Sequence, residues 1–164
     1  TSTGKNLIAY HNRTTFGGGN HFLFISQYTF NSRGDLVMSP NRYAGETVRK
    51  VTEDEVLNIS AGKYAYVAVT NNRYDSTYNG GYAKEDLMLA ENNVLKIGNT
   101  AVGSWYLYGD NYIYIEITGG DAALQGKYYG AVMPAYIESQ REGGLTISCL
   151  SENGKNTLYL NSLV

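Results

Sequence analysis

Apolar and polar residues alternate with a period of two in several short segments of this chain. The clearest is Tyr112–Ile117, where three isoleucines share one face and two tyrosines and a glutamate share the other. Alternation of this kind predicts a half-buried antiparallel strand. Similar segments occur at residues 64–69, 105–108, 127–133 and 158–160. The pattern therefore predicts a chain built from short strands.

Turn-forming residues separate these segments at short intervals. Glycine combined with asparagine, aspartate or a second glycine occurs at residues 79–81, 109–111, 119–121, 143–144 and 152–154. These residue types accept the positive φ angles that tight turns require. Short strands joined by frequent turns predict an all-β fold, in which the sheet closes into a barrel or folds into a sandwich.

One short helix is expected at residues 52–57. Thr52 and Glu55 have the spacing of a capping box, and the acidic residues that follow Thr52 suit the positive end of the helix dipole. A hairpin turn at 31–35 and a strand end at 39–43 precede this helix. Its position suggests a hinge between two parts, and we place their boundary near residue 44.

Composition and charge narrow the class of protein. The 164 residues include 19 glycines and 16 tyrosines but only two prolines, which favours strands and turns over helices. The formal net charge is −2 and the basic residues are scattered, so we expect no nucleic-acid partner. No apolar run approaches the roughly 20 residues that span a bilayer, so we expect no membrane partner either. A neutral ligand such as a polysaccharide fits better.

Cys149 is the only cysteine, so the chain has no intramolecular disulfide and no paired-cysteine metal or redox motif. It shares one face of its expected strand with Leu145 and Ile147. A buried structural thiol is the favoured interpretation, ahead of a nucleophile.

The carboxylates do not suggest a complete catalytic pair. Hydrolysis of a glycosidic bond needs one acid with a raised pKa and a second carboxylate across the sugar. The acidic residues considered lie in turns, at the helix start or on a tyrosine-bearing strand face: Asp35, Asp110, Asp121, Glu53, Asp54, Glu55 and Glu116. We expect solvated surface roles for all of them and assign no catalytic residue to this chain.

The two histidines flank a glycine run. His11 ends the apolar run 7–10, His21 opens the run 22–25, and Gly17–Gly19 lie between them. Without a cysteine or a nearby carboxylate they form no zinc pattern. The glycines precede a strand instead of a helix, so a hairpin loop is expected in place of a phosphate site.

Several of these segments resemble one enzyme family. Residues 8–13, the His21 strand and residues 32–46 resemble the end of the catalytic domain of endo-α-1,5-L-arabinanases of glycoside hydrolase family 43. The remainder is similar to the small C-terminal β-barrel of those enzymes. Its marks are Gly62-Lys63-Tyr64, Asp86-Leu87-Met88-Leu89, Gly103-Ser104-Trp105, Gly109-Asp110-Asn111-Tyr112-Ile113, Tyr129-Gly130-Ala131-Val132 and Leu145-Thr146-Ile147.

The resemblance implies two domains: residues 1–43 as the last strands of a catalytic β-propeller, and residues 44–164 as an antiparallel β-barrel. It implies that His11 matches the histidine next to a calcium ion at the propeller axis, where water fills most of the coordination shell. The catalytic carboxylates of the family lie in earlier blades. The chain alone is therefore expected to be inactive, with an N-terminal propeller segment as its partner and arabinan or arabino-oligosaccharides as the substrate. A secreted, extracellular enzyme is expected.

The chain departs from the family pattern at two places. Met133-Pro134-Ala135-Tyr136 stands where the family has an aromatic pair, and residues 36–40 lack the usual Trp-Pro. We expect the join between propeller and barrel to differ in detail. The abrupt start implies a lost preceding segment, and self-cleavage before Thr1 is one hypothesis for it.

Two alternatives to a hydrolase fragment stay open. The first is a non-catalytic barrel that binds carbohydrate through surface tyrosines and Trp105, since aromatic faces stack on sugars. The same tyrosines equally suit structural roles in strands. The second is a lipocalin-like carrier, which requires an open cavity inside the barrel.

Overall fold

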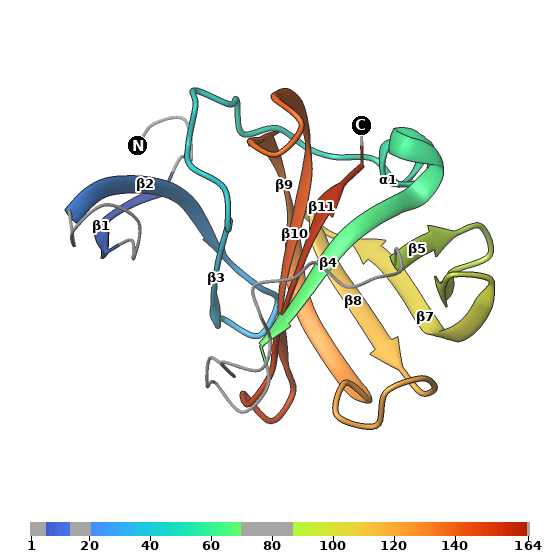
Figure 1. Ribbon diagram of the computed structural model, residues 1–164. Coiled ribbons are helices and arrows are strands. Elements are labelled where there is room, and N and C mark those ends of the chain that lie inside the picture. Colours follow the sequence, from blue (N-terminus) through green and yellow to red (C-terminus); the bar gives the residue numbers. More distant parts are fainter. Residues whose placement is uncertain (1–5, 14–20, 70–86, 164) are drawn as a thin grey trace.

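The computed structural model describes residues 6–13, 21–69 and 87–163, and its strands form two antiparallel sheets (Figure 1). One sheet has three strands in the order β1-β2-β3, and the other is a closed barrel in the order β10-β11-β4-β5-β6-β7-β8-β9. The strands are β1 (Asn6–Arg13), β2 (His21–Phe30), β3 (Leu36–Met38), β4 (Lys63–Val69), β5 (Leu87–Ala90), β6 (Val94–Ile97), β7 (Thr100–Tyr108), β8 (Tyr112–Ile117), β9 (Gly126–Ile137), β10 (Glu142–Ser151) and β11 (Thr157–Ser162). The all-β prediction is confirmed, as are the five strand segments.

Three sequence features lie outside the described residues. They are Thr1 with its proposed self-cleavage, the glycine run at 17–19 and the turn at 79–81. The predicted boundary near residue 44 falls between β3 and the helix and stays a prediction. Among the described residues, no helix has the length and apolar content needed to cross a bilayer.

The barrel closes because its first and last strands pair with each other. β4 runs antiparallel to β11, with Tyr64 opposite Ser162 and Val69 opposite Thr157. Closure gives every barrel strand two hydrogen-bonded neighbours and removes the free edges that an open sheet would expose. The sequence pattern was compatible with either a barrel or a sandwich, and the pairing of β4 with β11 shows that the fold is a barrel.

Large side chains fill the barrel interior. Trp105, Tyr64 and Tyr128 are at most 1% exposed. Their polar atoms all donate to backbone carbonyl oxygens: the Trp105 indole to Ala90 at 3.0 Å, Tyr64 to Val56 at 3.0 Å and Tyr128 to Leu124 at 2.7 Å. The aliphatic core around them includes Leu87, Leu89, Leu95, Ile113, Ile115, Ile147, Leu158 and Leu160.

This packing contradicts one feature of each of the two alternatives. Trp105 is not a surface platform for sugars, because position 105 lies on the inward face of β7 and its side chain is fully buried. A carrier with an open interior is also wrong, because the inward-facing described side chains form one continuous core. A barrel of this size is filled by its own side chains.

The predicted helix is confirmed as α1 (Glu53–Asn58), followed by the 3-10 turn η1 (Ile59–Gly62). Its capping box is complete: Glu55 N–H donates to Thr52 Oγ1 at 3.2 Å, and Thr52 N–H donates to the Glu55 carboxylate at 2.9 Å. Val56 is fully buried in the barrel core. The helix therefore packs against the barrel core, and the hinge between two parts that its sequence position suggested stays a prediction.

Both faces of β9 and β10 are buried, which a half-buried strand would not show. On β10, Ile147 and Cys149 point into the barrel core, whereas Thr146 and Ser148 point outward and are still at most 1% exposed. The three-stranded sheet covers this outer face, with β3 against β10 and β2 against β9 (Figure 1). The buried structural role predicted for Cys149 is confirmed, and burial raises the pKa of its thiol.

Candidate functional site

The candidate site residue from the sequence, His11, lies on β1. Its backbone pairs with Leu23 of β2, and its side chain is exposed. Next to it in the register, Tyr10 faces Phe24, and their rings stack with centroids 5.7 Å apart. The backbone of His21 pairs with Arg13 near the other end of β1, so the two histidines are not directly opposite one another.

The described residues do not form a calcium site by themselves. Calcium takes six to eight oxygen ligands. Within the described ranges, no group of three or more His, Cys, Asp or Glu side chains is arranged to hold a metal ion. His11 therefore stays a prediction that requires ligands from outside these residues, and no reaction step follows from it.

One cavity contains two carboxylates, Glu46 and Glu55, and Glu46 was not considered in the sequence analysis. This cavity, of about 550 Å³, lies between the helix and the β9–β10 pair. The Glu46 carboxylate accepts the Tyr136 N–H at 2.8 Å and the Ala44 N–H at 3.0 Å. Glu55 caps the helix and pairs with Arg49 at 2.7 Å.

Both carboxylates thus accept hydrogen bonds from backbone N–H groups. The hydrogen bond from the Thr52 N–H, ahead of the contribution from Arg49, holds the pKa of Glu55 below its usual value. A general acid in glycoside hydrolysis needs the opposite shift. The pKa of Glu55 is thus shifted away from what a general acid requires, which agrees with the surface role expected for this residue.

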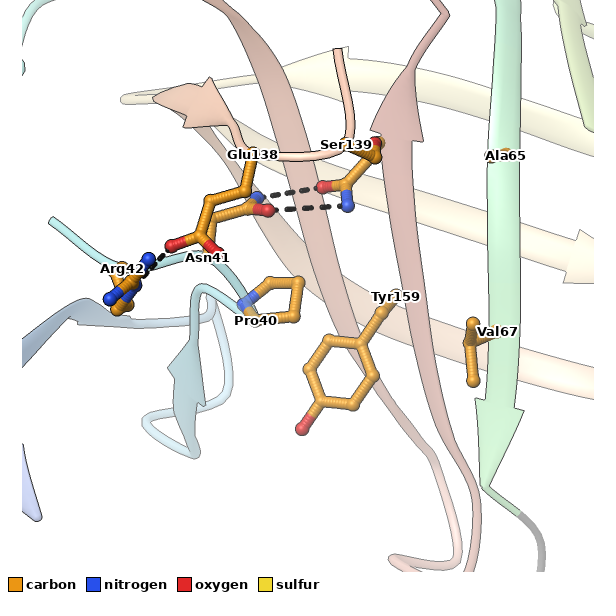
Figure 2. A pocket seen from close by; sticks show the side chains of 9 residues that line it. Pro40, Asn41, Arg42, Ala65, Val67, Glu138, Ser139 and Tyr159 are labelled. Carbon is orange, nitrogen blue, oxygen red and sulfur yellow. Dashed lines mark hydrogen bonds and ion pairs between the residues drawn. The ribbon is translucent and has the colours of Figure 1, made fainter. Parts of the chain in front are cut away.

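A second cavity lies where the segment after β3 crosses the barrel (Figure 2). It measures about 300 Å³. Asn41 and Asn161 face each other across it, and Asn41 Nδ2 donates to Asn161 Oδ1 at 2.8 Å. Beside them, the Arg42 guanidinium donates to the Glu138 carboxylate, a pair that also raises the pKa of Arg42.

Figure 2 shows Tyr159 on the other side of this cavity, with Pro40 nearby. Burial, and to a lesser extent Tyr10, raises the pKa of the Tyr159 hydroxyl, so the tyrosine stays neutral. Asn41 with Asn161, and Arg42 with Glu138, form polar pairs across the two parts of the fold. The arrangement is a joint between the sheet and the barrel.

The β2–β3 turn makes a second joint with the barrel. Asn31 Nδ2 donates to the Tyr129 carbonyl oxygen at 3.1 Å, and the hydroxyls of Ser32 and Tyr108 lie 2.6 Å apart. Arg33 donates to the Glu152 carbonyl oxygen at 3.1 Å. These contacts fix the turn against the outer face of the barrel and orient the whole sheet.

The far end of the sheet is exposed and apolar. β1 and β2 extend away from the barrel (Figure 1). Leu23 is 71% exposed, the highest value among the large exposed hydrophobic residues; the others on this sheet are Leu7, Phe22, Ile25, Phe30 and Leu36. No described strand pairs with the outer edge of β1. An open edge beside an exposed apolar surface is typical of an interaction site.

Comparison with known proteins supplies the decisive observation. A family model described as the C-terminal lipocalin-like domain (GH43_C) matches residues 40–158. The chain belongs to this family. The match begins just after β3 and includes the helix and most of the barrel. The resemblance drawn from the sequence is therefore confirmed.

The relatives of this GH43_C chain are much longer than the chain itself. An extracellular endo-α-(1→5)-L-arabinanase of Thermotoga petrophila is 26% identical over 152 residues, which cover 93% of the chain and 30% of the relative. An extracellular endo-α-(1→5)-L-arabinanase 2 of Bacillus subtilis is 27% identical over 154 residues, which cover 93% and 29%. The chain spans about a third of the length of these relatives.

Solved structures agree with this match. A family 43 glycoside hydrolase from Bacillus licheniformis superposes with a TM-score of 0.76 at 27% identity, over 99% of the chain and 33% of that protein. The T. petrophila endo-1,5-α-L-arabinanase gives a TM-score of 0.75 at 22% identity over 99% and 33%, a likeness of fold. Both superpositions include the three-stranded sheet as well as the barrel.

Proposed function

We propose that this GH43_C chain is the C-terminal portion of an extracellular arabinan-degrading glycosidase that cleaves α-1,5-L-arabinofuranosidic linkages. In this proposal, the catalytic carboxylates belong to an N-terminal propeller segment, and the chain alone is inactive. The names of the relatives and their threefold greater length support the substrate and the missing segment.

The observation that carries the proposal is the incomplete three-stranded sheet beside a complete barrel. Propeller blades are usually four-stranded sheets that pack face to face with their neighbours. The sheet has three described strands, a β1 edge with which no described strand pairs, and an exposed apolar surface around Leu23. These are the features expected of the closing strands of a blade whose remaining partners lie in another segment.

The first test is intact-mass and gel analysis of the purified protein, paired with an assay on linear arabinan. We expect a larger polypeptide to accompany or continue the chain in active preparations, and the isolated 164-residue chain to release no arabino-oligosaccharides. Hydrolysis by the isolated chain would overturn the assignment of the carboxylates to another segment. An active complex that cleaves a different polysaccharide would overturn the substrate.

Within this proposal, His11 is the residue that the chain contributes to a calcium site. Its other ligands would come from the N-terminal segment, because the described residues do not provide them. We expect His11→Ala in the complete enzyme to weaken calcium binding, measured by equilibrium dialysis with radioactive calcium. Unchanged calcium binding would remove His11 from the metal site and leave the hydrolase proposal standing.

A further inference from the structure

Five tyrosines gather on the outer face of β7, β8 and β9, and together they form what we term the tyrosine face. Its members are Tyr106, Tyr108, Tyr112, Tyr114 and Tyr129. The strand register places Tyr106 opposite Tyr114, and Tyr114 opposite Tyr129. Centroid separations along this row are 4.9 and 5.3 Å, so the rings form a continuous aromatic strip across three strands.

Contacts between neighbouring rings and from the β2–β3 turn hold these rings in place. Tyr106 and Tyr114 are stacked with an interplanar angle of 29°. Ser32, in the β2–β3 turn, holds the Tyr108 hydroxyl at 2.6 Å, and the Arg33 guanidinium lies 5.0 Å from the Tyr129 ring centroid. A surface that is ordered in advance loses less conformational entropy when a ligand binds. The tyrosine face is therefore preorganised.

The tyrosine face is accessible at its outer rings, whereas the central Tyr114 is only 8% exposed, and the charges around the face are balanced. Tyr106 is 45% exposed, and Tyr108 and Tyr112 are partly exposed. Arg33 pairs with Asp35 at 3.8 Å. Glu116, beside Tyr114 on β8, lies opposite Lys127 in the register. Aromatic rings with hydroxyl tips match a neutral ligand, and the two cations beside them, Arg33 and Lys127, each lie near a carboxylate, so they do not form the basic patch that a nucleic acid requires.

We propose that the tyrosine face binds a neutral polysaccharide chain without hydrolysing it. The apolar C–H faces of sugar rings would pack on the exposed phenol rings, and the phenol hydroxyls would exchange hydrogen bonds with sugar hydroxyls. Such a surface would keep the protein close to an insoluble or dilute polysaccharide substrate. The choice of linear arabinan as the probe rests on the proposed function, whereas the binding surface itself does not.

Affinity electrophoresis of the 164-residue chain in native gels containing linear arabinan tests the proposal. We expect the chain to be retarded, and Tyr106→Ala to weaken binding about tenfold because it removes the most exposed ring. Tyr106→Phe should retain binding, since the ring remains. Tyr136→Ala, at the other end of β9, is the matched control and should bind as the unaltered chain does. Urea unfolding of each variant verifies that the barrel is intact.

The outcomes separate this proposal from the proposed function, because no hydrolysis is measured. Retardation that is lost in Tyr106→Ala but kept in Tyr106→Phe supports the tyrosine face. Equal retardation of all variants would overturn the tyrosine face as the binding surface. The same conclusion follows if arabinan, xylan and galactan all fail to retard the unaltered chain. Either result leaves the hydrolase proposal intact. Tyr106-dependent binding to xylan or galactan alone supports the surface and contradicts arabinan as its ligand. Tyr106-dependent dimers in sedimentation velocity, without sugar binding, would overturn it in favour of self-association.

Discussion

The side-chain amides of Asn41 and Asn161 pair with each other across 120 residues of chain, with Asn41 Nδ2 donating to Asn161 Oδ1 at 2.8 Å and Asn161 Nδ2 donating to Asn41 Oδ1 at 3.4 Å. Asn41 follows the three-stranded sheet, and Asn161 belongs to the last strand of the barrel. Thr146 also donates to Asn161 Oδ1 at 2.8 Å. The pair therefore joins the sheet segment to two barrel strands.

Asn41→Ala is expected to lower the free energy of unfolding by about 1–2 kcal/mol, because it removes the buried Asn41 amide and leaves the partly buried Asn161 with Thr146 as its remaining side-chain partner. Urea denaturation followed by the fluorescence of Trp105, the single tryptophan, measures the effect. Ser139→Ala is the matched control, since Ser139 lines the same cavity but is exposed. Equal stability of the two variants would show that the amide pair does not hold the joint.

Gly130→Ala is expected to destabilise the barrel by about 2–3 kcal/mol. A Cβ at Gly130 would lie 2.3 Å from the Ser148 carbonyl oxygen and 2.4 Å from Cys149 Sγ on the neighbouring strand. Since the oxygen is backbone, the clash can be relieved only by moving β9 away from β10. Thermal unfolding by circular dichroism measures the loss.

The control for this substitution is Gly143→Ala in β10. An added Cβ at Gly143 meets nothing within 4 Å, so we expect a change within about 0.5 kcal/mol. If Gly130→Ala were equally mild, the close approach of β9 and β10 at this position would be contradicted.

The helix cap gives a pH-dependent prediction. Because the folded-state pKa of Glu55 is lowered, its contribution to stability is present above the unfolded-state pKa and is lost as pH falls through the folded value. We expect a contribution below about 1 kcal/mol, since the carboxylate is largely solvated. Glu55→Gln should make the loss of stability below about pH 5 shallower.

Urea unfolding at a series of pH values measures this slope. Glu53→Gln, in the same helical turn, removes one negative charge without removing the capping carboxylate and serves as the control. If Glu53→Gln changed the acid slope as much as Glu55→Gln, general charge would explain the effect and the cap would not.

Leu23→Ser is expected to reduce binding of a hydrophobic dye to the isolated chain while changing the free energy of unfolding by less than about 0.5 kcal/mol. Leu23 is 71% exposed, so its side chain contributes to the apolar surface and little to the core. Fluorescence titration with anilinonaphthalene sulfonate measures the binding of the dye. Lys127→Ser, at another exposed site, should leave dye binding unchanged. A loss of more than about 2 kcal/mol in Leu23→Ser would place Leu23 in a packed core instead.

The sequence alone determined those elements of this protein that depend on residues close together in the chain. Alternation placed Ile113, Ile115 and Ile117 on one buried face of β8, as found. The spacing of Thr52 and Glu55 was sufficient for the capping box, because both hydrogen bonds form within one helical turn. Cys149 was assigned to the core from its face of β10, and the structure confirms it.

The tertiary structure decided everything that depends on distant neighbours. Alternation cannot tell which face of a strand points inward when both carry large side chains, so it left open the alternative in which Trp105 lies on the surface, whereas Trp105 fills the core. It cannot foresee the sheet that covers the outer face of β10 and buries Ser148. The row from Tyr106 to Tyr129 likewise exists only because three strands align in register. Period and spacing act within a few residues, whereas closure of the barrel and docking of the sheet depend on surfaces that meet only after the chain has folded.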